Sequence, residues 1–570
     1  MRKILLATVF LLVICVIVYA HLSSQKLVTS APKLLTEPFL QLPTESSVRV
    51  VWFTEFAGSK HIVKYGENNQ QTAVTTTKLS RTREDQQSHV GNQTKEAEFY
   101  QKPVKRDIWR HEAEVVGLTP GKRVPYSVTS VGEDGLSVSS NVFTLAAKPT
   151  PGTPLKILLT SDHQLKPMIA ANLQKVVQTV GQVDAVFFAG DLVDIADRAS
   201  EWFDDNRGGA FFPCLQGRAK HEIEFNGVKT AYTGGKIIQY APMFTSIGNH
   251  EVMGRFGKSG SIGGEFGDTI PRAVAKKLYG EKSLDDSLFN TKTYEEILTL
   301  PESKEGGETY YAVSFGDVRL VVLYAANMWR PPNLDAAKGK YQETKKDLNN
   351  PVAWGYGQHI YEPIEKGSKQ YNWLVQELNS PEFKKAKYKV VMFHYPPHSL
   401  GDNIVPPYTN PVPLLERDAN QNITSVRYQY PKNADYIIRD VQPLLEAARV
   451  QLVFYGHSHL WNRFRNQSGM NFLETSNVGN TYGAFLGNNK RKLLPADKDY
   501  VEVGDPNALE PVTPTITQLL GDDGKPLPYI ASNEITVFSI FDTGTGKVSS
   551  YRFDTRQPES EVIKFDEFKL

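Results

Sequence analysis

Five apolar stretches of this 570-residue sequence end in residues that can bind a metal ion. The endings are Asp162 in "LLTSD", Asp191 in "FFAGD", Asn249 and His250 in "TSIGNHE", His394 in "VMFH", and His457 with His459 in "FYGHSH". Each ending, taken alone, is equally typical of a polar loop residue. Five such endings in succession indicate that the side chains serve one shared site.

The types of these side chains narrow the chemistry. Two carboxylates, an amide oxygen and three imidazoles form a mixed oxygen and nitrogen set without a thiolate, which suits Zn, Fe or Mn. The set is too large for one four-coordinate ion and fits two ions that share a carboxylate, about 3.5–4 Å apart. Such a site keeps a net positive charge, which attracts a phosphate ester and lowers the pKa of bound water. The chemistry predicted is displacement at phosphorus.

The stretch "VQLVFYGHSHLW" shows how one strand end can supply two ligands. In an extended chain, residues two positions apart point to the same side, so His457 and His459 can reach one point. Gly456 lets the backbone pass close to whatever lies there. A pair of surface histidines in a turn is the alternative for this stretch alone.

The elements around these endings predict a parallel sheet. "LKILLTSD" and "DAVFFAGD" are typical of buried strands, and "MIAANLQKVVQTVG" between them has helical spacing and ends at Gly181. Such a β-α-β unit implies parallel strands with covered faces. Two further helices are predicted, at residues 368–379 and 433–448. Because ligands of an open α/β sheet bind beyond the carboxyl ends of its strands, the five endings should share one rim.

Residues 32–148 have a different pattern. Short segments rich in Val, Tyr, Phe and Thr alternate with turn residues, which predicts an all-β sandwich with a structural or docking role. The stretch "GLTPGKRVPYSVTSV" is similar to the E–F corner of a fibronectin type III domain, with Tyr126 as the corner tyrosine. The proline-rich "AAKPTPGTP" that follows is expected to be a linker.

The composition and the N-terminal residues limit the expected partners and location of the protein. The net charge is +1 and no basic block occurs, so no nucleic acid binding is expected. Residues 1–24 place Arg2 and Lys3 before an apolar run, with Ala20 as a cleavage point. This layout is typical of a secretory signal, or alternatively of an uncleaved anchor. We therefore expect an exported protein (periplasmic, secreted or at the cell surface), with membrane contact only through this segment if it is uncleaved.

The ordered series "SD", "GDLVD", "GNHE", "FH" and "GHSH" resembles the calcineurin-like metallophosphoesterases. With a sandwich in front, the sequence is most similar to the purple acid phosphatases and their bacterial relatives. The resemblance implies a four-layer α/β/β/α sandwich preceded by an all-β, fibronectin III-like sandwich. The implied domains are residues 1–24 as signal or anchor, 32–148 as the sandwich, and 155–555 as a catalytic domain with long insertions.

The resemblance also implies a role for each matching residue. Asp191 would bridge two metal ions, with Asp162 and His459 on the first and Asn249, His394 and His457 on the second. His250 would contact the phosphate and assist departure of the leaving group. His398, four residues after His394, would contact the substrate, its alternative being an exposed loop histidine.

Two positions depart from the family pattern. Asp194 stands where the purple enzymes have a tyrosine, and Asp162-His163-Gln164 stands where another branch has Asp-x-His. Gln164 can offer the first metal an amide oxygen, because it lies on the same side as Asp162, whereas His163 should point away. Asp194 can be either a metal ligand or a solvated residue.

These observations predict an exported, binuclear phosphoesterase that cleaves a small phosphate ester by attack of metal-bound hydroxide. The two divalent or trivalent ions would be Fe, Zn or Mn. A phosphomonoesterase is the first expectation. The alternatives are a phosphodiesterase or nucleotide pyrophosphatase using the same site, and a binding protein with a vestigial metal site.

Overall fold

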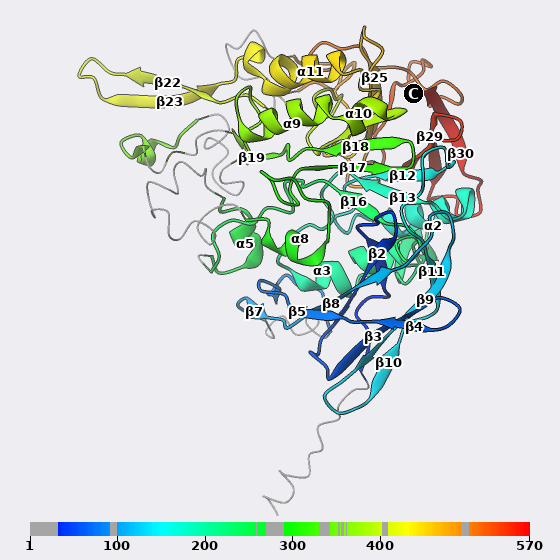
Figure 1. Ribbon diagram of the computed structural model, residues 1–570. Helices are drawn as coiled ribbons and strands as arrows, with labels where there is room; N and C mark the ends of the chain where they lie inside the picture. The colour runs from blue at the N-terminus through cyan, green and yellow to red at the C-terminus, as the bar shows by residue number, and fades with distance from the viewer. Residues whose placement is uncertain are drawn as a thin grey trace, which may run out of the picture.

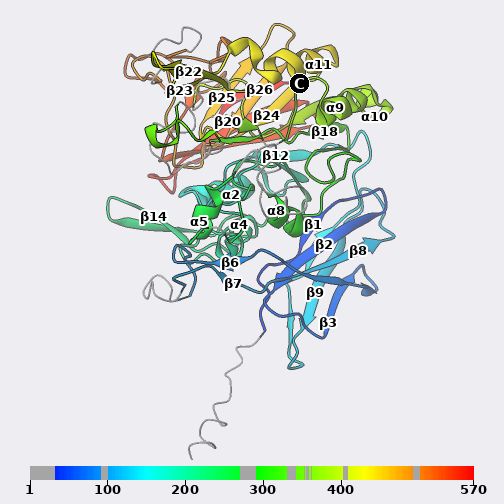
Figure 2. The ribbon, with the colours of Figure 1, turned by 90° about the vertical axis from the view of Figure 1, so that its left-hand side faces the viewer.

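The computed structural model describes residues 32–91, 100–257, 259–269, 290–329, 342–351, 354, 358–360, 362–401, 408–491 and 501–570. The predicted signal or anchor, residues 1–24, lies outside these ranges. An all-β domain and a larger α/β domain lie against each other, as two perpendicular views show (Figure 1, Figure 2). No helix of the described residues is long and apolar enough to cross a bilayer.

The first sheet of the α/β domain has six strands in the order β16-β13-β12-β28-β29-β30. These strands are β12 (Lys156–Thr160), β13 (Ala185–Phe188), β16 (Met243–Thr245), β28 (Ile535–Asp542), β29 (Lys547–Asp554) and β30 (Ile563–Lys569). The strand β13 runs parallel to β12 and β16, which confirms the predicted β-α-β unit. The strand β28 runs antiparallel to β12 and brings the C-terminal region into the same sheet.

The second sheet has seven strands in the order β17-β18-β21-β24-β26-β25-β27. These strands are β17 (Tyr311–Phe315), β18 (Val318–Val322), β21 (Tyr388–Met392), β24 (Leu452–Tyr455), β25 (Trp461–Arg465), β26 (Asn471–Thr475) and β27 (Tyr529–Ile530). The four strands β18, β21, β24 and β26 are parallel. The predicted strand ends are thus divided between two sheets.

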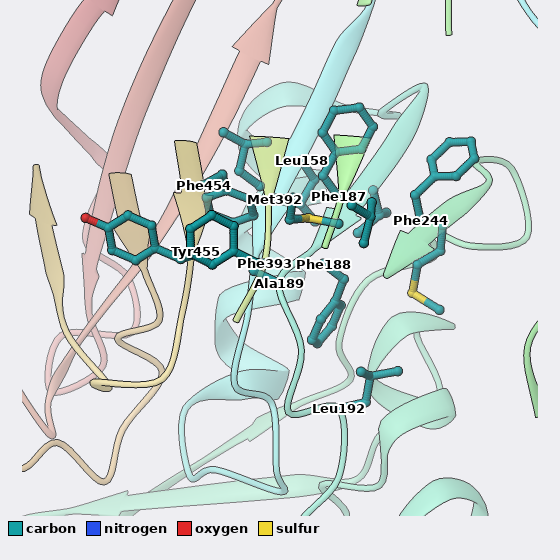
Figure 3. Packing of buried hydrophobic residues seen from close by; sticks show 14 of the residues in the cluster. Leu158, Phe187, Phe188, Ala189, Leu192, Phe244, Met392, Phe393, Phe454 and Tyr455 are labelled. Carbon is teal, nitrogen blue, oxygen red and sulfur yellow. The ribbon is translucent and has the colours of Figure 1, made fainter. Parts of the chain in front are cut away.

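Alternate side chains of the buried strands point to opposite faces of each sheet. One set packs against the other sheet, and the other set packs against helices. In the first sheet, Phe244 meets Phe315 of the second sheet with ring centroids 5.7 Å apart. Phe188 faces the opposite way and packs on Phe211 of α4. Side chains from β12, β13, β21 and β24 therefore belong to one continuous core (Figure 3). Because neighbouring strand residues point to opposite faces, a strand covered on both faces must be apolar throughout, as β13 is.

Helices cover the outer faces of both sheets. They are α2 (Ile169–Val180), α3 (Ala199–Phe203), α4 (Phe211–Leu215), α5 (Ile262–Phe266), α8 (Lys292–Ile297), α9 (Lys369–Asn379), α10 (Pro381–Lys385) and α11 (Gln442–Ala447). The predicted end of α2 at Gly181 is confirmed, since this residue has a φ of 73°. The helix α9 matches its prediction and is capped by the Ser368 side chain, which accepts a hydrogen bond from the Tyr371 amide.

The second predicted helix, at residues 433–448, is interrupted. The structure has a 3₁₀ turn at Lys432–Ala434 and a π-helical turn at Ile437–Val441, and α11 begins only at Gln442. Pro443 explains the break, because proline lacks the amide hydrogen that a continuous helix needs and is tolerated in a first turn.

Three hairpins extend from the α/β domain. They are β14 (His221–Phe225) with β15 (Val228–Tyr232), β19 (Asn327–Trp329) with β20 (Gln358–Ile360), and β22 (Val412–Arg417) with β23 (Ile423–Gln429). The hairpin β22–β23 projects far from the sheets (Figure 1). The hairpins β14–β15 and β22–β23 and a short 3₁₀ turn at Lys345–Asp347 lie in the long insertions expected within residues 155–555.

The N-terminal domain is a sandwich of two antiparallel sheets, ordered β1-β2-β8-β5 and β10-β9-β3-β4, with β11 also paired to β9. Its strands are β1 (Phe39–Gln41), β2 (Ser47–Thr54), β3 (Lys60–Tyr65), β4 (Gln70–Thr72), β5 (Thr75–Lys78), β8 (Trp109–Val116), β9 (Val124–Val131), β10 (Ser137–Ser139) and β11 (Phe143–Leu145). A small ladder of β6 (Arg83–Glu84) and β7 (Val104–Lys105) lies beside it. The predicted all-β sandwich ahead of an α/β/β/α domain is confirmed.

Tyr126 differs from its expected role. A corner tyrosine bonds the backbone a few residues upstream in its own domain. Here the Tyr126 hydroxyl donates to the carbonyl of Gln239, in the α/β domain, over 2.7 Å. Arg123 makes a parallel contact with the Tyr240 carbonyl at 2.6 Å. The predicted corner is therefore wrong, because these side chains join two domains rather than close a turn within one.

Two imidazoles stack on each other in the sandwich, and one of them is fully buried. The rings of His61 and His111 lie with centroids 3.7 Å apart. His111 is fully buried, and its two nitrogens contact the hydroxyls of Thr54 and Thr76 at 2.8 and 2.9 Å. Neither hydroxyl carries a negative charge, so a second proton on this ring has no compensating partner.

We expect His111 to make the free energy of unfolding depend on pH. Burial, together with His61 and Arg110, lowers the pKa of His111 from 6.5 to about 3. Above the unfolded pKa of 6.5 its contribution is fully present, and between 6.5 and about 3 only the unfolded chain gains the proton, so stability falls on acidification. Urea unfolding of the full chain over this range should show that fall, with a smaller slope in His111→Gln.

The matched control is His221→Gln, at a partly exposed ring that contacts the Arg207 carbonyl. This change should leave the slope of unfolding free energy against pH as it is. Equal slopes in the wild-type protein and His111→Gln would contradict the prediction.

Candidate metal centre

The predicted ligands come from both sheets and meet at one rim. Asp162, Asp191 and Asn249 follow β12, β13 and β16 of the first sheet, and His394 and the histidine pair follow β21 and β24 of the second. Each lies beyond the carboxyl end of its strand, where ligands of α/β proteins bind. The expected gathering of side chains at one rim is what the fold produces.

Asp191 contacts residues from every part of this rim. Its Oδ2 accepts a hydrogen bond from Gln164 Nε2 at 2.8 Å and lies 3.1 Å from His394 Nε2. Its Oδ1 accepts from the His250 amide at 3.0 Å. Ligand atoms of Asp191, His394 and His457 all lie within 4.8 Å of one another, a spacing that a metal ion can bridge. His394 Nε2 also lies 3.2 Å from Asn249 Oδ1.

Asp162 lies beside the Asp191 cluster and has its own set of contacts. Its Oδ2 accepts the His457 amide at 2.9 Å and the Ser161 hydroxyl, and its Oδ1 lies 3.5 Å from His459 Nε2. Both Asp162 Oδ1 and Gln164 Oε1 are buried and accept no hydrogen bond within the described chain. Buried oxygens left without donors suit a bound cation.

Two glycines allow the turns to approach so closely. A Cβ on Gly456 would lie 1.9 Å from Ser161 Oγ and 2.2 Å from Asp162 Oδ2. A Cβ on Gly248 would lie 2.1 Å from Asp191 Oδ1. The glycine that precedes the paired histidines therefore serves contact between the two sheets, since it lets the β24 turn rest on the β12 turn.

Left-handed backbone is concentrated among the predicted ligands. Positive φ angles occur at Asp162 (57°), Gln164 (38°), Asp191 (58°), His457 (83°) and His459 (53°). Such conformations are costly for residues other than glycine and persist where surrounding contacts enforce them. The strain indicates that the ligand turns are held by the rest of the domain.

A buried carboxylate holds the Asp191 turn. Glu251 accepts hydrogen bonds from the backbone amides of Asp191 at 2.9 Å, Leu192 at 2.7 Å and Gly248 at 2.7 Å. Burial and the charge of Asp191 raise the pKa of Glu251 to about 8. These bonds give Glu251 a structural role, because they tie the β13 and β16 turns together.

Glu474 plays the corresponding part for the histidine pair, and sequence reasoning missed it. One oxygen accepts the Ser458 amide at 2.7 Å, between His457 and His459, and the other accepts from Ser399 and Asn462 at 2.9 Å. Glu474 lies in β26, next to β24. The available signal was a glutamate inside the apolar stretch "MNFLET".

Two tyrosines also escaped the sequence reasoning. Tyr395 stacks on His457 with centroids 3.6 Å apart, and Tyr482 stacks on His459 at 4.9 Å. Tyr395 directly follows His394, whereas Tyr482 comes from a distant loop. Each stacked ring fixes the plane of the imidazole beside it.

Of the residues in doubt, His163 and Asp194 are placed away from the ligand cluster. His163 is buried against Phe188, with its Nε2 3.1 Å from Thr160 Oγ1, and burial lowers its pKa to about 3. The expectation that it points away is confirmed. The Asp194 side chain is 49% exposed, as expected of a solvated residue.

His398 does not join the site as expected. Its Nδ1 lies 2.7 Å from Asp505 Oδ2, and its Nε2 lies 3.2 Å from Gln442 Oε1. The ring is buried against Phe464 and Phe472. Both nitrogens are thus occupied inside the protein, and the substrate contact predicted from the sequence is corrected to a structural one.

Family models and solved structures agree with this architecture. The calcineurin-like phosphoesterase model matches residues 155–460, and the model of the purple acid phosphatase N-terminal domain matches residues 36–146. The chain belongs to the calcineurin-like phosphoesterases. It is a metal-dependent phosphoester hydrolase of the purple acid phosphatase type, as the motif series predicts.

The purple acid phosphatase PPD1 from yellow lupin seeds shares the fold, with a TM-score of 0.52 at 13% identity, over 94% of this chain and 74% of that one. A structure of PhoD aligns with a TM-score of 0.40 at 13% identity, over 94% of this chain and 92% of that one. The comparison with curated proteins gives no match.

The charges in the phosphoesterase centre suit a cation. Burial raises the pKa of Asp191, but His394 and His250 outweigh that effect, so its pKa lies below the ordinary value. Burial lowers the pKa of His394, but Asp191 more than offsets it and raises the value to about 10. His394 Nδ1 donates to the Ala189 carbonyl at 2.7 Å, and His459 Nδ1 donates to Asn480 at 2.9 Å. Their Nε2 atoms are thereby aimed at the carboxylates, the usual arrangement of metal-binding histidines.

We expect Gly456→Ala to separate the two ligand turns of the phosphoesterase. The added Cβ meets the Asp162 carboxylate, so metal content and kcat should fall together, kcat by roughly 10²-fold. Elemental analysis and steady-state kinetics measure both quantities, and circular dichroism checks that the fold persists. Gly260→Ala is the control, because a Cβ there meets nothing within 4 Å. Full metal content and activity in Gly456→Ala would contradict the close approach.

Proposed function

We propose that this chain is an exported phosphomonoesterase with two metal ions (Fe, Zn or Mn). Asp191 would be the ligand that the two ions share. Asp162, Gln164 and His459 would hold the first ion, and Asn249, His394 and His457 would hold the second. His250 is the catalytic residue that assists the leaving group, and the substrate is a small phosphate ester.

The contacts of Asp191 carry this proposal. Its carboxylate lies within 3.1 Å of side chains from both halves of the ligand set, Gln164 on one side and His394 on the other. Asp162, whose buried Oδ1 accepts no hydrogen bond within the described residues, stands beside the first half, and Asn249 stands beside the second. A shared carboxylate between two ligand sets is the arrangement that two-metal hydrolases use. The metal ions, when bound, supply the Lewis acidity that activates water and neutralises phosphate charge.

His250 is oriented to give a proton to the leaving oxygen. Its Nδ1 donates to the Asp194 carbonyl at 2.6 Å, which leaves Nε2 as the nitrogen that faces the centre, 4.0 Å from Asp191 Oδ2. In the reaction a water oxygen forms the new P–O bond while the P–O bond to the alcohol breaks. His250 Nε2 gives its proton to the departing oxygen, and the proton that water loses restores His250 through solvent.

The charge around the rim favours a dianionic monoester. Lys166 is buried in the turn that carries Asp162 and Gln164. Burial lowers the pKa of Lys166, and the carboxylates of Asp194 and Asp162 act in the opposite direction. A buried ammonium and two metal ions together give the site more positive than negative charge, which attracts the more highly charged ester.

Export rests on residues 1–24. Arg2 and Lys3, the apolar run and Ala20 support a secretory signal, and residues after it would form the mature protein. N-terminal sequencing of the protein recovered outside the cytoplasm would locate the cleavage point, and retention of Met1 there would favour the anchor.

We expect a strong chelator to abolish hydrolysis of nitrophenyl phosphate, and a divalent transition metal to restore it. The intact enzyme should hydrolyse the monoester at least about tenfold faster than bis(nitrophenyl) phosphate, because the dianion gains more from the cationic site. Steady-state kinetics with both esters measure this preference. A reversed preference would make the chain a phosphodiesterase, and full activity after chelation would contradict the metal assignment.

A matched pair of variants tests whether the loss of metal and activity is specific to Asp191. Asp191→Asn should remove bound metal and activity, because it deletes a charge that both ligand sets contact. Asp184→Asn changes the carboxylate before the same strand, where it accepts the Lys156 amide at 2.8 Å, and should keep both.

We expect His250→Ala to lower kcat by roughly 10²–10⁴-fold for an alkyl phosphate such as glycerol 2-phosphate. The loss for nitrophenyl phosphate should be much smaller, because nitrophenolate departs without a proton. Metal content should stay as in the wild-type protein, since His250 is not a ligand. Equal losses for the two esters would remove His250 from the leaving-group role, and loss of metal would make it a ligand.

A further inference from the structure

Two elements hold the ring of His250. The Asp194 carbonyl accepts from Nδ1 at 2.6 Å, and Phe266 of α5 stacks on the ring with centroids 5.0 Å apart and planes at 27°. The first contact sets the ring's rotation and the second covers one face. The direction of Nε2 therefore depends on where the loop after Asp191 and the helix α5 lie.

One guanidinium from the N-terminal sandwich region ties both elements together. Arg83 of β6 donates to both carboxylate oxygens of Glu265 in α5, at 2.9 and 2.6 Å. The same guanidinium donates to Asp197 Oδ2 at 2.9 Å, and the Arg83 amide donates to the Asp197 carbonyl at 2.9 Å. Glu265 directly precedes Phe266, and Asp197 lies three residues after Asp194.

The bridge is buried and specific. Arg83 is 6% exposed, and Asp197 and Glu265 are fully buried. Removing Arg83 takes from the buried Glu265 carboxylate the guanidinium that pairs with both of its oxygens, whereas Asp197 keeps Arg81 at 3.1 Å, so α5 is the element that must shift. Bidentate pairing also fixes the angle between the guanidinium and the carboxylate, which lysine cannot reproduce.

A small apolar cluster transmits this placement to the site. Ile195 and Ala196 of the loop pack with Met253 and Ile262, and Phe266 packs against them. Residues of the loop, the turn after His250 and the helix α5 thus form one unit. In both ribbon views α5 lies on the side of the catalytic domain towards β6 and β7 (Figure 1, Figure 2).

We propose that Arg83 is a positioning residue for His250, so that the N-terminal sandwich region takes part in the reaction and is more than a structural or docking module. Arg83 touches neither substrate nor metal ligands. It acts by holding Glu265 and Asp197, and through them Phe266 and Asp194, at the places that aim His250 Nε2. This inference rests on the leaving-group role proposed above for His250.

The test uses the dependence of rate on the leaving group. In the full-length metal-loaded protein, Arg83→Gln should lower kcat for glycerol 2-phosphate by roughly tenfold and for nitrophenyl phosphate by less than about twofold. KM and metal content should stay as in the wild-type enzyme. Combined with His250→Ala, Arg83→Gln should cause no further loss for the alkyl ester, because the group it positions is absent.

Arg106→Gln is the matched control. Arg106 is also an arginine of the sandwich region that pairs across the interface. Its side chain is 12% exposed and donates to both oxygens of Asp204 at 2.7 Å, but it contacts neither Asp197 nor α5 in the described structure. Its loss should lower thermal stability without changing the ratio of the two rates. A ratio changed equally by Arg106→Gln and Arg83→Gln would overturn the proposal, as would equal losses for both esters in Arg83→Gln.

A second variant covers the case in which Arg83→Gln fails to fold. Phe266→Leu removes the stacked ring at a half-buried position and should show the same selective loss for the alkyl ester. Equal losses for both esters in Phe266→Leu would overturn the positioning route. If His250→Ala itself shows no leaving-group dependence, the proposed function fails. A selective loss in His250→Ala alone means that only the role of Arg83 fails.

Discussion

Burying the Asp191 carboxylate costs free energy that only donors or cations around it can offset. The structure surrounds it with an amide from Gln164, an imidazole from His394 and the backbone amide of His250. These groups come from turns on two different sheets, so the charge of one side chain sets how the sheets must face each other. The two sheets are joined on this rim by polar contacts and below it by the apolar core.

Two buried glutamates stabilise the backbone turns that carry these groups. Glu251 gathers amides of the β13 and β16 turns, and Glu474 gathers the β24 turn with its neighbours. Both accept hydrogen bonds from segments whose own residues adopt left-handed conformations. The backbone conformation of the ligand turns is thus set by two buried carboxylates that are not themselves among the proposed ligands. A centre built this way is preorganised, since its ligands need no rearrangement before they bind.

The sequence could predict the rim because each ligand directly follows an apolar strand, and strand ends converge by topology alone. Glu474, Tyr482 and Arg83 were not predicted, because no local sequence pattern identifies the side chains of other elements that they contact. His398 shows the opposite error: proximity to His394 in sequence suggested a shared site, yet Asp505, more than a hundred residues later, takes its ring inward. Local spacing identifies elements, and only tertiary contacts identify the partners of a side chain.

The pairing of β12 with β28 bears on how this chain is made. The strand β12, which leads to Asp162, pairs along one edge with residues 539–542 of β28. The Leu155 amide donates to the Thr543 hydroxyl, 388 positions later. A ribosome adding about 5–20 residues per second needs roughly 20–80 seconds between the two strands. Throughout that interval β12 has an unpaired edge, and such edges promote association between chains. The catalytic domain therefore completes its first sheet only after residues 535–542 have been synthesised.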